Sequence, residues 1–139
     1  MSKPAVLFVC VKNAGKSQMA AALMRKLVGD RVDVYSAGTN PGDALNDLSV
    51  RVLAEVGAPV DGEHPKPIDP RLLEHVNVVV TLGSEAHLDT AATPSQTWIT
   101  DEPSTRGIDG IERMRLIRDD IAARVQTLAA QLLTTTEIP

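Results

Sequence analysis

The sequence begins with an apolar run that leads into a polar, glycine-containing loop and then into a helical pattern. Ala5–Val9 is entirely apolar, which is typical of a buried parallel strand. Val11–Lys16 is polar, and from Lys16 to Leu27 apolar residues recur on one helix face, at Met19, Leu23 and Leu27. A strand, a loop and a helix in this order indicate an α/β fold, because the helix must cover a sheet that the strand begins.

The rest of the chain alternates in the same way between short apolar runs and helical patterns. The further strands predicted are Val32–Tyr35, Val76–Leu82 and Gln96–Ile99. The further helices predicted are Leu45–Val56 and Ile108–Leu133. The strand interiors are apolar rather than alternating, so the sheet should be parallel and covered on both faces. We therefore predict one three-layer α/β/α domain over residues 1–139, with a four-stranded parallel sheet.

Three segments between these elements carry local signals. Ser36–Thr39 is predicted to form a turn after the second strand. His64–Pro70 contains three prolines and should be an exposed loop. The segment with Glu85, His87 and Asp89 should begin a surface helix, on which acid, histidine and acid at alternate positions do not converge. We therefore predict no metal site.

Composition excludes several classes of protein. The formal charge of −4 and only three aromatic residues in 139 argue against nucleic-acid binding. No apolar stretch approaches the ~20 residues of a membrane-spanning helix, and no signal peptide pattern is present, so we expect a cytoplasmic protein without membrane partners. A single cysteine, Cys10, excludes an internal disulfide and a zinc site of several thiolates.

Cys10 stands where the first strand ends and the loop begins, which is where parallel sheets place ligands. The amides at the start of the following helix have no intrahelical acceptors and, with the helix dipole, attract anions. A thiol in that cradle is pushed toward thiolate. Lys16 adds a cation, Ser17 could donate to the sulfur, and Asn13 could pin the loop. The oxyanion-binding segment predicted is Val11, Lys12, Asn13, Ala14, Gly15, Lys16 and Ser17.

Two other interpretations of this loop remain open. A lone cysteine at a strand end is often a small buried apolar residue, although such a residue requires no glycine, asparagine and cation after it. The loop also fits the phosphate-binding signature G-x-x-x-x-G-K-[ST] at every position but the first, where Cys10 stands for glycine. Against a nucleotide site, no later apolar strand ends in the aspartate that would complete a magnesium site.

Several segments together resemble a known family. Cys10 to Ser17 is similar to the C-x5-R-S loop of the low-molecular-weight tyrosine phosphatases and of the arsenate reductases that share their fold. Ser17–Ala20 resembles the arsenate-reductase branch, and Ser36–Thr39 and Val78–Leu82 fit later segments of the family. Trp98–Pro103 resembles the loop that carries the family's general acid, which implies that role for Asp101.

Two departures from the family pattern matter. The loop arginine of the family is Lys16 here, and lysine offers a point charge where arginine grips an oxyanion with two parallel bonds. Thioredoxin-coupled arsenate reductases also use two further cysteines, and the matching positions here are Gly83 and Thr90. The resemblance to single-cysteine actinobacterial enzymes implies mycothiol as co-substrate and a mycoredoxin, or another glutaredoxin-like protein, as reductant, with no tightly bound cofactor.

The resemblance thus implies an arsenate–mycothiol transferase in which Cys10 attacks arsenate, Lys16 balances its charge and Asp101 is the acid. Three other functions remain as alternatives: a phosphomonoesterase of the tyrosine phosphatase type, a nucleotide-binding protein and a non-enzymatic oxyanion sensor. The arginines at positions 106, 113, 115 and 118 are expected to serve solubility and ion pairing.

Overall fold

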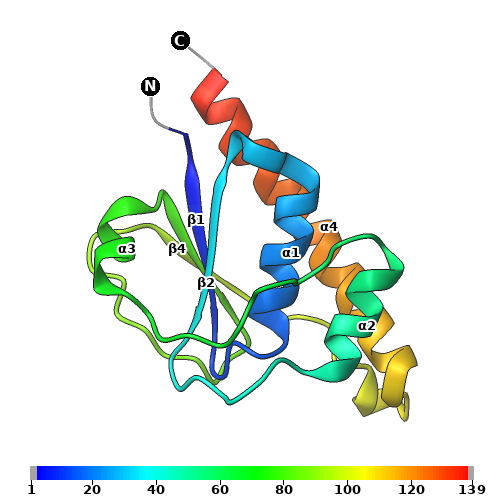
Figure 1. The fold of residues 1–139 in the computed structure, drawn as a ribbon. Coiled ribbons are helices and arrows are strands. Elements are labelled where there is room, and N and C mark those ends of the chain that lie inside the picture. Colours follow the sequence, from blue (N-terminus) through cyan, green and yellow to red (C-terminus); the bar gives the residue numbers. More distant parts are fainter. Residues whose placement is uncertain (1–2, 138–139) are drawn as a thin grey trace.

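Four parallel strands form the sheet, in the order β2-β1-β3-β4 (Figure 1). The computed structural model describes residues 3–137, so the ends of the predicted domain, residues 1–2 and 138–139, lie outside the described residues. The strands are β1 (Ala5–Cys10), β2 (Asp33–Gly38), β3 (Val78–Leu82) and β4 (Ser95–Trp98). The predicted fold class is confirmed, with each predicted strand present at slightly shifted bounds.

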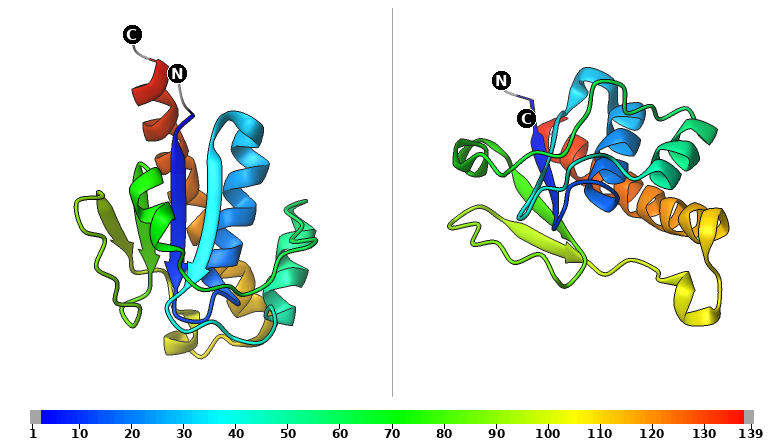
Figure 2. Two further views of the ribbon diagram at one scale, coloured as in Figure 1. Left: turned by 60° about the vertical axis from the view of Figure 1, so that its left-hand side comes forward. Right: turned by 60° about the horizontal axis from the view of Figure 1, so that its bottom comes forward.

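Three helices pack on one face of the sheet (Figures 1 and 2). They are α1 (Lys16–Val28), α2 (Asp47–Glu55) and α4 (Gly110–Glu137). The main core lies between this face and the helices, where Phe8 of β1 is fully buried among residues such as Met24 of α1 and Ile121 of α4. The central strand β1 is buried along its whole length, which fixes the position of its last residue.

The opposite face of the sheet has a thinner cover, the short helix α3 (Pro70–His75) with the segments around it (Figure 1). Leu72 and Leu73 pack there against Leu7 and Val79. Asp69 caps α3 by accepting from the Arg71 amide. This helix is absent from the sequence prediction because six residues are too short to show a helical period.

Two local predictions were wrong. Ser36–Gly38 continues strand β2 instead of forming a turn, because Ser36, Ala37 and Gly38 pair in register with β1. The segment from Glu85 to Asp89 is not a helix: the Asp89 carboxylate accepts from the Ala91 amide, which closes a tight turn instead of adding a helical bond.

Short 3₁₀ helices complete the fold at Gly29–Arg31 (η1) and Pro103–Arg106 (η2). No helix within residues 3–137 is both long and apolar enough to cross a membrane.

Candidate active site

Cys10 is the last residue of the central strand and is 9% exposed. Its sulfur lies 2.9 Å from Ser17 Oγ and accepts the Asn13 backbone N–H at 3.2 Å. Asn13 and Ser17 are themselves fully buried. The sulfur therefore borders the core but contacts two hydrogen-bonding groups of its own loop, which an inert apolar cysteine does not require.

The loop between β1 and α1 is held from outside by the segment that follows β2. The carbonyls of Cys10, Val11, Lys12 and Ala14 accept from the amides of Thr39, Asn40, Gly42 and Asn46 at 2.8–3.1 Å. In a trans peptide the N–H of the next residue points opposite to the carbonyl. The amides of residues 11, 12, 13 and 15 therefore point away from this segment, and the Asn13 amide does reach the Cys10 sulfur.

Helix α1 begins directly after this loop. Gly15 precedes it and offers no side-chain cap, while the first helical bond runs from the Met19 amide to the Gly15 carbonyl. The amides of the first turn are thus left without an intrahelical acceptor. Unpaired amides at a helix start, with the helix dipole, attract an anion.

The conformation of the loop depends on Asn13 and Gly38. Asn13 has φ 53°, a left-handed value that asparagine tolerates better than most residues. Gly38 packs so closely that a Cβ there would lie 2.6 Å from the Val11 carbonyl oxygen and 3.0 Å from the Asn13 amide nitrogen. Only glycine leaves room for this approach.

Replacing Gly38 with alanine is expected to destabilise the protein by about 1–3 kcal/mol, the usual cost of overpacking, and to displace the cysteine loop. The measurement is chemical denaturation together with the rate of Cys10 alkylation. Gly42→Ala is the matched control, because a Cβ at Gly42 would meet its nearest neighbour at 3.7 Å. Equal stabilities for the two variants would contradict the close-packing argument.

The two loop lysines occupy different environments. Lys16 is half-buried at the first position of α1, and Lys12 is exposed. Neither forms a salt bridge within the described part of the chain. Lys16 is therefore available to balance an anion held at the start of the helix.

Asp101 lies in the segment after β4, at the same edge of the sheet as Cys10. Strand β3 separates β4 from β1, which corresponds to about 10 Å between their axes. Both carboxylate oxygens of Asp101 accept from Arg106, at 2.8 and 3.0 Å. The Arg106 hydrogen bonds hold the pKa of Asp101 below its ordinary value. Among the described residues, its carboxylate has no hydrogen bond to the cysteine loop.

Ion pairs hold this segment to helix α4. Glu102 accepts two hydrogen bonds from Arg113, at 2.7 and 2.8 Å, and they lower the pKa of Glu102 to about 2. Asp120 of α4 accepts from the Asp101 amide at 2.8 Å. The arginines expected to form ion pairs do so, with Arg115 and Arg118 both on Glu55. Each of these arginines is thus committed to a carboxylate rather than free for a ligand.

Further residues that the sequence analysis missed hold the cysteine loop in place. Gln18 donates to the Asn13 side-chain oxygen and to the His64 carbonyl, both at 3.1 Å. The Lys66 amide donates to the same Asn13 oxygen at 3.1 Å. The segment 64–67 is irregular as predicted but is not simply an exposed loop, because it pairs with Gly38 and Asn13. No local sequence signal links positions 18 and 64.

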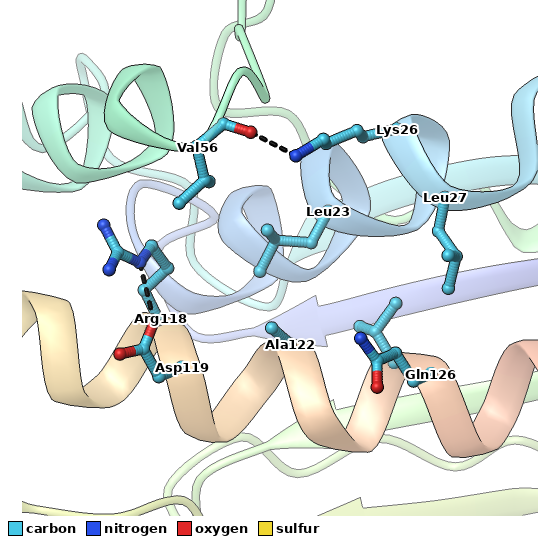
Figure 3. Close-up of a pocket in the computed structure, with 9 residues that line it drawn as sticks. Leu23, Lys26, Leu27, Val56, Arg118, Asp119, Ala122 and Gln126 are labelled. Atoms are coloured by element: carbon cyan, nitrogen blue, oxygen red, sulfur yellow. Dashed lines mark hydrogen bonds and ion pairs between the residues drawn. The ribbon is translucent and has the colours of Figure 1, made fainter.

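A pocket of about 270 Å³ lies elsewhere, between the second half of α1 and α4 (Figure 3). Two contacts join polar groups of its lining: Lys26 donates to the Val56 carbonyl, and Arg118 pairs with Asp119. No cysteine, serine or threonine lines it. Within residues 3–137 no three His, Cys, Asp or Glu side chains gather as a metal site would require.

Fold and site together define an α/β domain that presents one cysteine sulfur in an amide-lined loop at the carboxyl edge of a parallel sheet. The chain belongs to the low molecular weight phosphotyrosine protein phosphatase family, whose profile matches residues 5–137.

Relatives within the family are named for arsenate chemistry. The chain is 35% identical over 127 residues to a putative arsenate reductase of Halobacterium salinarum, covering 87% of each chain. It is 34% identical over 136 residues to an arsenate reductase of Halalkalibacterium halodurans, covering 93% of this chain and 97% of the relative.

Solved structures of proteins named as arsenate reductases also match this chain. A thioredoxin-dependent arsenate reductase of Corynebacterium glutamicum superimposes with a TM-score of 0.77 and 28% identity. That match covers 96% of this chain but only 63% of the longer Corynebacterium chain. An arsenate reductase in a phosphate-binding state has a TM-score of 0.81 and 26% identity, covering 93% of this chain and 98% of the other.

Proposed function

We propose that this protein is an arsenate reductase in which Cys10 is the nucleophile. The observation that carries the proposal is the Cys10 sulfur, which accepts the Asn13 amide and contacts Ser17 Oγ in a loop whose amides can hold an oxyanion. Two relatives above 30% identity that match most of the chain are named arsenate reductases or putative ones, which favours arsenate over other tetrahedral anions.

In the first step arsenate binds to the amides of residues 11–17, with Lys16 balancing part of its charge. The Cys10 thiolate attacks arsenic, a sulfur–arsenic bond forms, and one arsenic–oxygen bond breaks. Asp101 delivers a proton to the departing oxygen, which leaves as water. Arsenic is still pentavalent in this adduct, so the two electrons for reduction come from thiols in later steps.

An external thiol must complete the reaction, because the 139 residues contain one cysteine. We propose that mycothiol attacks the arsenic of the adduct, frees Cys10 and carries the arsenic away as a mycothiol adduct. A mycoredoxin thiolate then attacks the mycothiol sulfur, forms a mixed disulfide and releases arsenite. In this scheme the protein is an arsenate–mycothiol transferase.

The test is turnover with different reductants. Protein and arsenate are mixed with mycothiol, mycoredoxin and their reductase, or with thioredoxin and thioredoxin reductase, and arsenite is measured. We expect arsenite only in the first mixture. Turnover with thioredoxin alone would refute the mycothiol step and leave the arsenate reductase proposal intact, whereas no turnover in any mixture would refute both.

A phosphomonoesterase is the second candidate, favoured by membership of a phosphatase family. Lys16 in place of the expected arginine argues against it, because lysine cannot grip a phosphoryl group with two parallel bonds. Cys10-dependent hydrolysis of p-nitrophenyl phosphate tests it. A nucleotide site is disfavoured because Ser17, which would have to bind magnesium, contacts the Cys10 sulfur.

A further inference from the structure

We infer that Gln18 is a positioning residue that favours the thiolate form of Cys10 through the side chains of Asn13 and Ser17. This deepens the proposed function, since it names what prepares the nucleophile. Gln18 lies on the first turn of α1 and is 2% exposed. Among the described residues its hydrogen bonds go to Asn13 and His64 rather than to Cys10, so any effect on the sulfur must pass through other groups.

The orientation of the Asn13 amide decides where the Ser17 proton goes. Asn13 Oδ1 accepts from Gln18 Nε2 and from the Lys66 amide, both at 3.1 Å. A backbone N–H can only donate, so this contact favours the orientation in which the oxygen faces the 64–66 segment, and the Gln18 donor adds to it. Asn13 Nδ2 then faces Ser17 and donates to its Oγ at 2.7 Å. Because Ser17 Oγ accepts there, its own proton is free for the Cys10 sulfur at 2.9 Å.

The flipped amide would reverse this chain of hydrogen bonds. Asn13 Oδ1 would then accept the Ser17 proton, and Ser17 would have none left for the sulfur. A hydrogen bond donated to an ionised group favours the ionised form, so the observed orientation favours the thiolate and the flipped one favours the thiol. Gln18 supplies one of the two donors that hold the observed orientation.

The hydrogen bonding of Gln18 itself indicates that it is not present for stability. Its Oε1 is buried and has no partner within the described residues, which costs free energy. Gln18 donates to two oxygens, and each would still have another donor if Gln18 were replaced. The Lys66 amide donates to Asn13 Oδ1, and Lys66 Nζ donates to the His64 carbonyl at 3.0 Å. Replacing Gln18 therefore leaves no acceptor unpaired, and it eliminates one unpaired acceptor, the Gln18 Oε1 itself.

The test is Gln18→Met, because the methionine side chain has a length similar to that of glutamine and carries no hydrogen-bonding amide. We expect the midpoint of Cys10 alkylation by iodoacetamide against pH to rise, with the alkylation rate at neutral pH falling about fivefold. We expect the midpoint of urea unfolding to be unchanged or higher. The substitution changes no charge. The parent and the variant therefore share the same charged or titratable side chains in the loop and in the segments bonded to it: Lys12, Lys16, Asp43, Asp47, Glu63, His64 and Lys66.

A double variant separates positioning from packing. Asn13→Gly tolerates the positive φ and adds no charge but removes the amide that donates to Ser17. In that background Gln18→Met should move the alkylation midpoint no further. A lower stability with an unmoved midpoint, or equal midpoint shifts in both backgrounds, would overturn the inference. The alkylation experiment uses no arsenate. Its outcome therefore does not depend on whether the parent protein turns over arsenate, so this inference and the proposed function can fail independently.

Discussion

Replacing Cys10 with serine is expected to abolish arsenate turnover and to leave the fold intact. A serine hydroxyl is far less acidic than a thiol and is the weaker nucleophile toward arsenic. The loss should be on the order of 10⁴-fold or more, the size typical of removing a catalytic nucleophile. The measurement is arsenite release with the mycothiol system. Sulfur and oxygen differ little in size, so the thermal unfolding midpoint should stay close to that of the parent.

Parent protein alkylated with iodoacetamide is the control, because it blocks the same sulfur without a change of sequence. It should be as inactive as Cys10→Ser. In the parent, mass spectrometry of protein quenched during turnover should find arsenic bound covalently to Cys10. Residual activity above one per cent of the parent rate would contradict Cys10 as the nucleophile. The threshold is set there because loss of a proton donor alone would reduce the rate by roughly 10²-fold.

Replacing Asp101 with asparagine is expected to reduce kcat by about 10²- to 10⁴-fold, the usual contribution of general acid catalysis. Asparagine keeps the shape but cannot deliver a proton to the departing oxygen. The oxyanion is held by the loop of residues 11–17, so arsenate affinity should change little. Single-turnover kinetics separate the chemical step from binding, and a rate equal to that of the parent would exclude Asp101 as the acid.

Arg106→Gln should act in the opposite direction. In the structure Arg106 lowers the pKa of Asp101, so Asp101 holds a proton only at acid pH and must leave Arg106 to reach the substrate. Without Arg106 the pKa rises toward the ordinary value of 3.8, and the protonated fraction at a given neutral pH increases. The alkaline limb of the kcat profile should therefore move to higher pH. A slower reaction at all pH values would show that Arg106 assists the acid instead.

Glu102→Gln is the matched control for both variants. Glu102 lies in the same segment as Asp101 and Arg106; the substitution breaks its ion pair with Arg113 of α4 but leaves the Asp101–Arg106 pair in place. Because the pKa of Glu102 is lowered, its ion pair with Arg113 stabilises the fold at pH values above the pKa of this carboxyl in the unfolded chain. The stabilisation is lost as the pH falls toward about 2. We expect slightly lower stability at neutral pH and an almost unchanged kcat.

Much of the cysteine loop was predictable because its signals are local. An apolar strand, a cysteine, a polar loop with one glycine and an amphipathic helix follow one another within 25 residues. Asn13 and Ser17 were proposed as loop contacts from position alone, and both do bond in the loop. Helix α3 and the end of β2 were missed because sheet pairing and a sparse cover of leucines decide them, and neither produces a period in the sequence.

The sequence by itself determined the chemistry available to this protein: one thiol at a strand end, a cation six residues later and an acid after the last strand. Only the tertiary structure decided how those groups are held. Gln18, Gly38 and Lys66 reach the loop from other elements, and Arg106 pairs with Asp101 and lowers its pKa. The reason is physical, since hydrogen bonds and close contacts depend on distances in space that separation along the chain does not set.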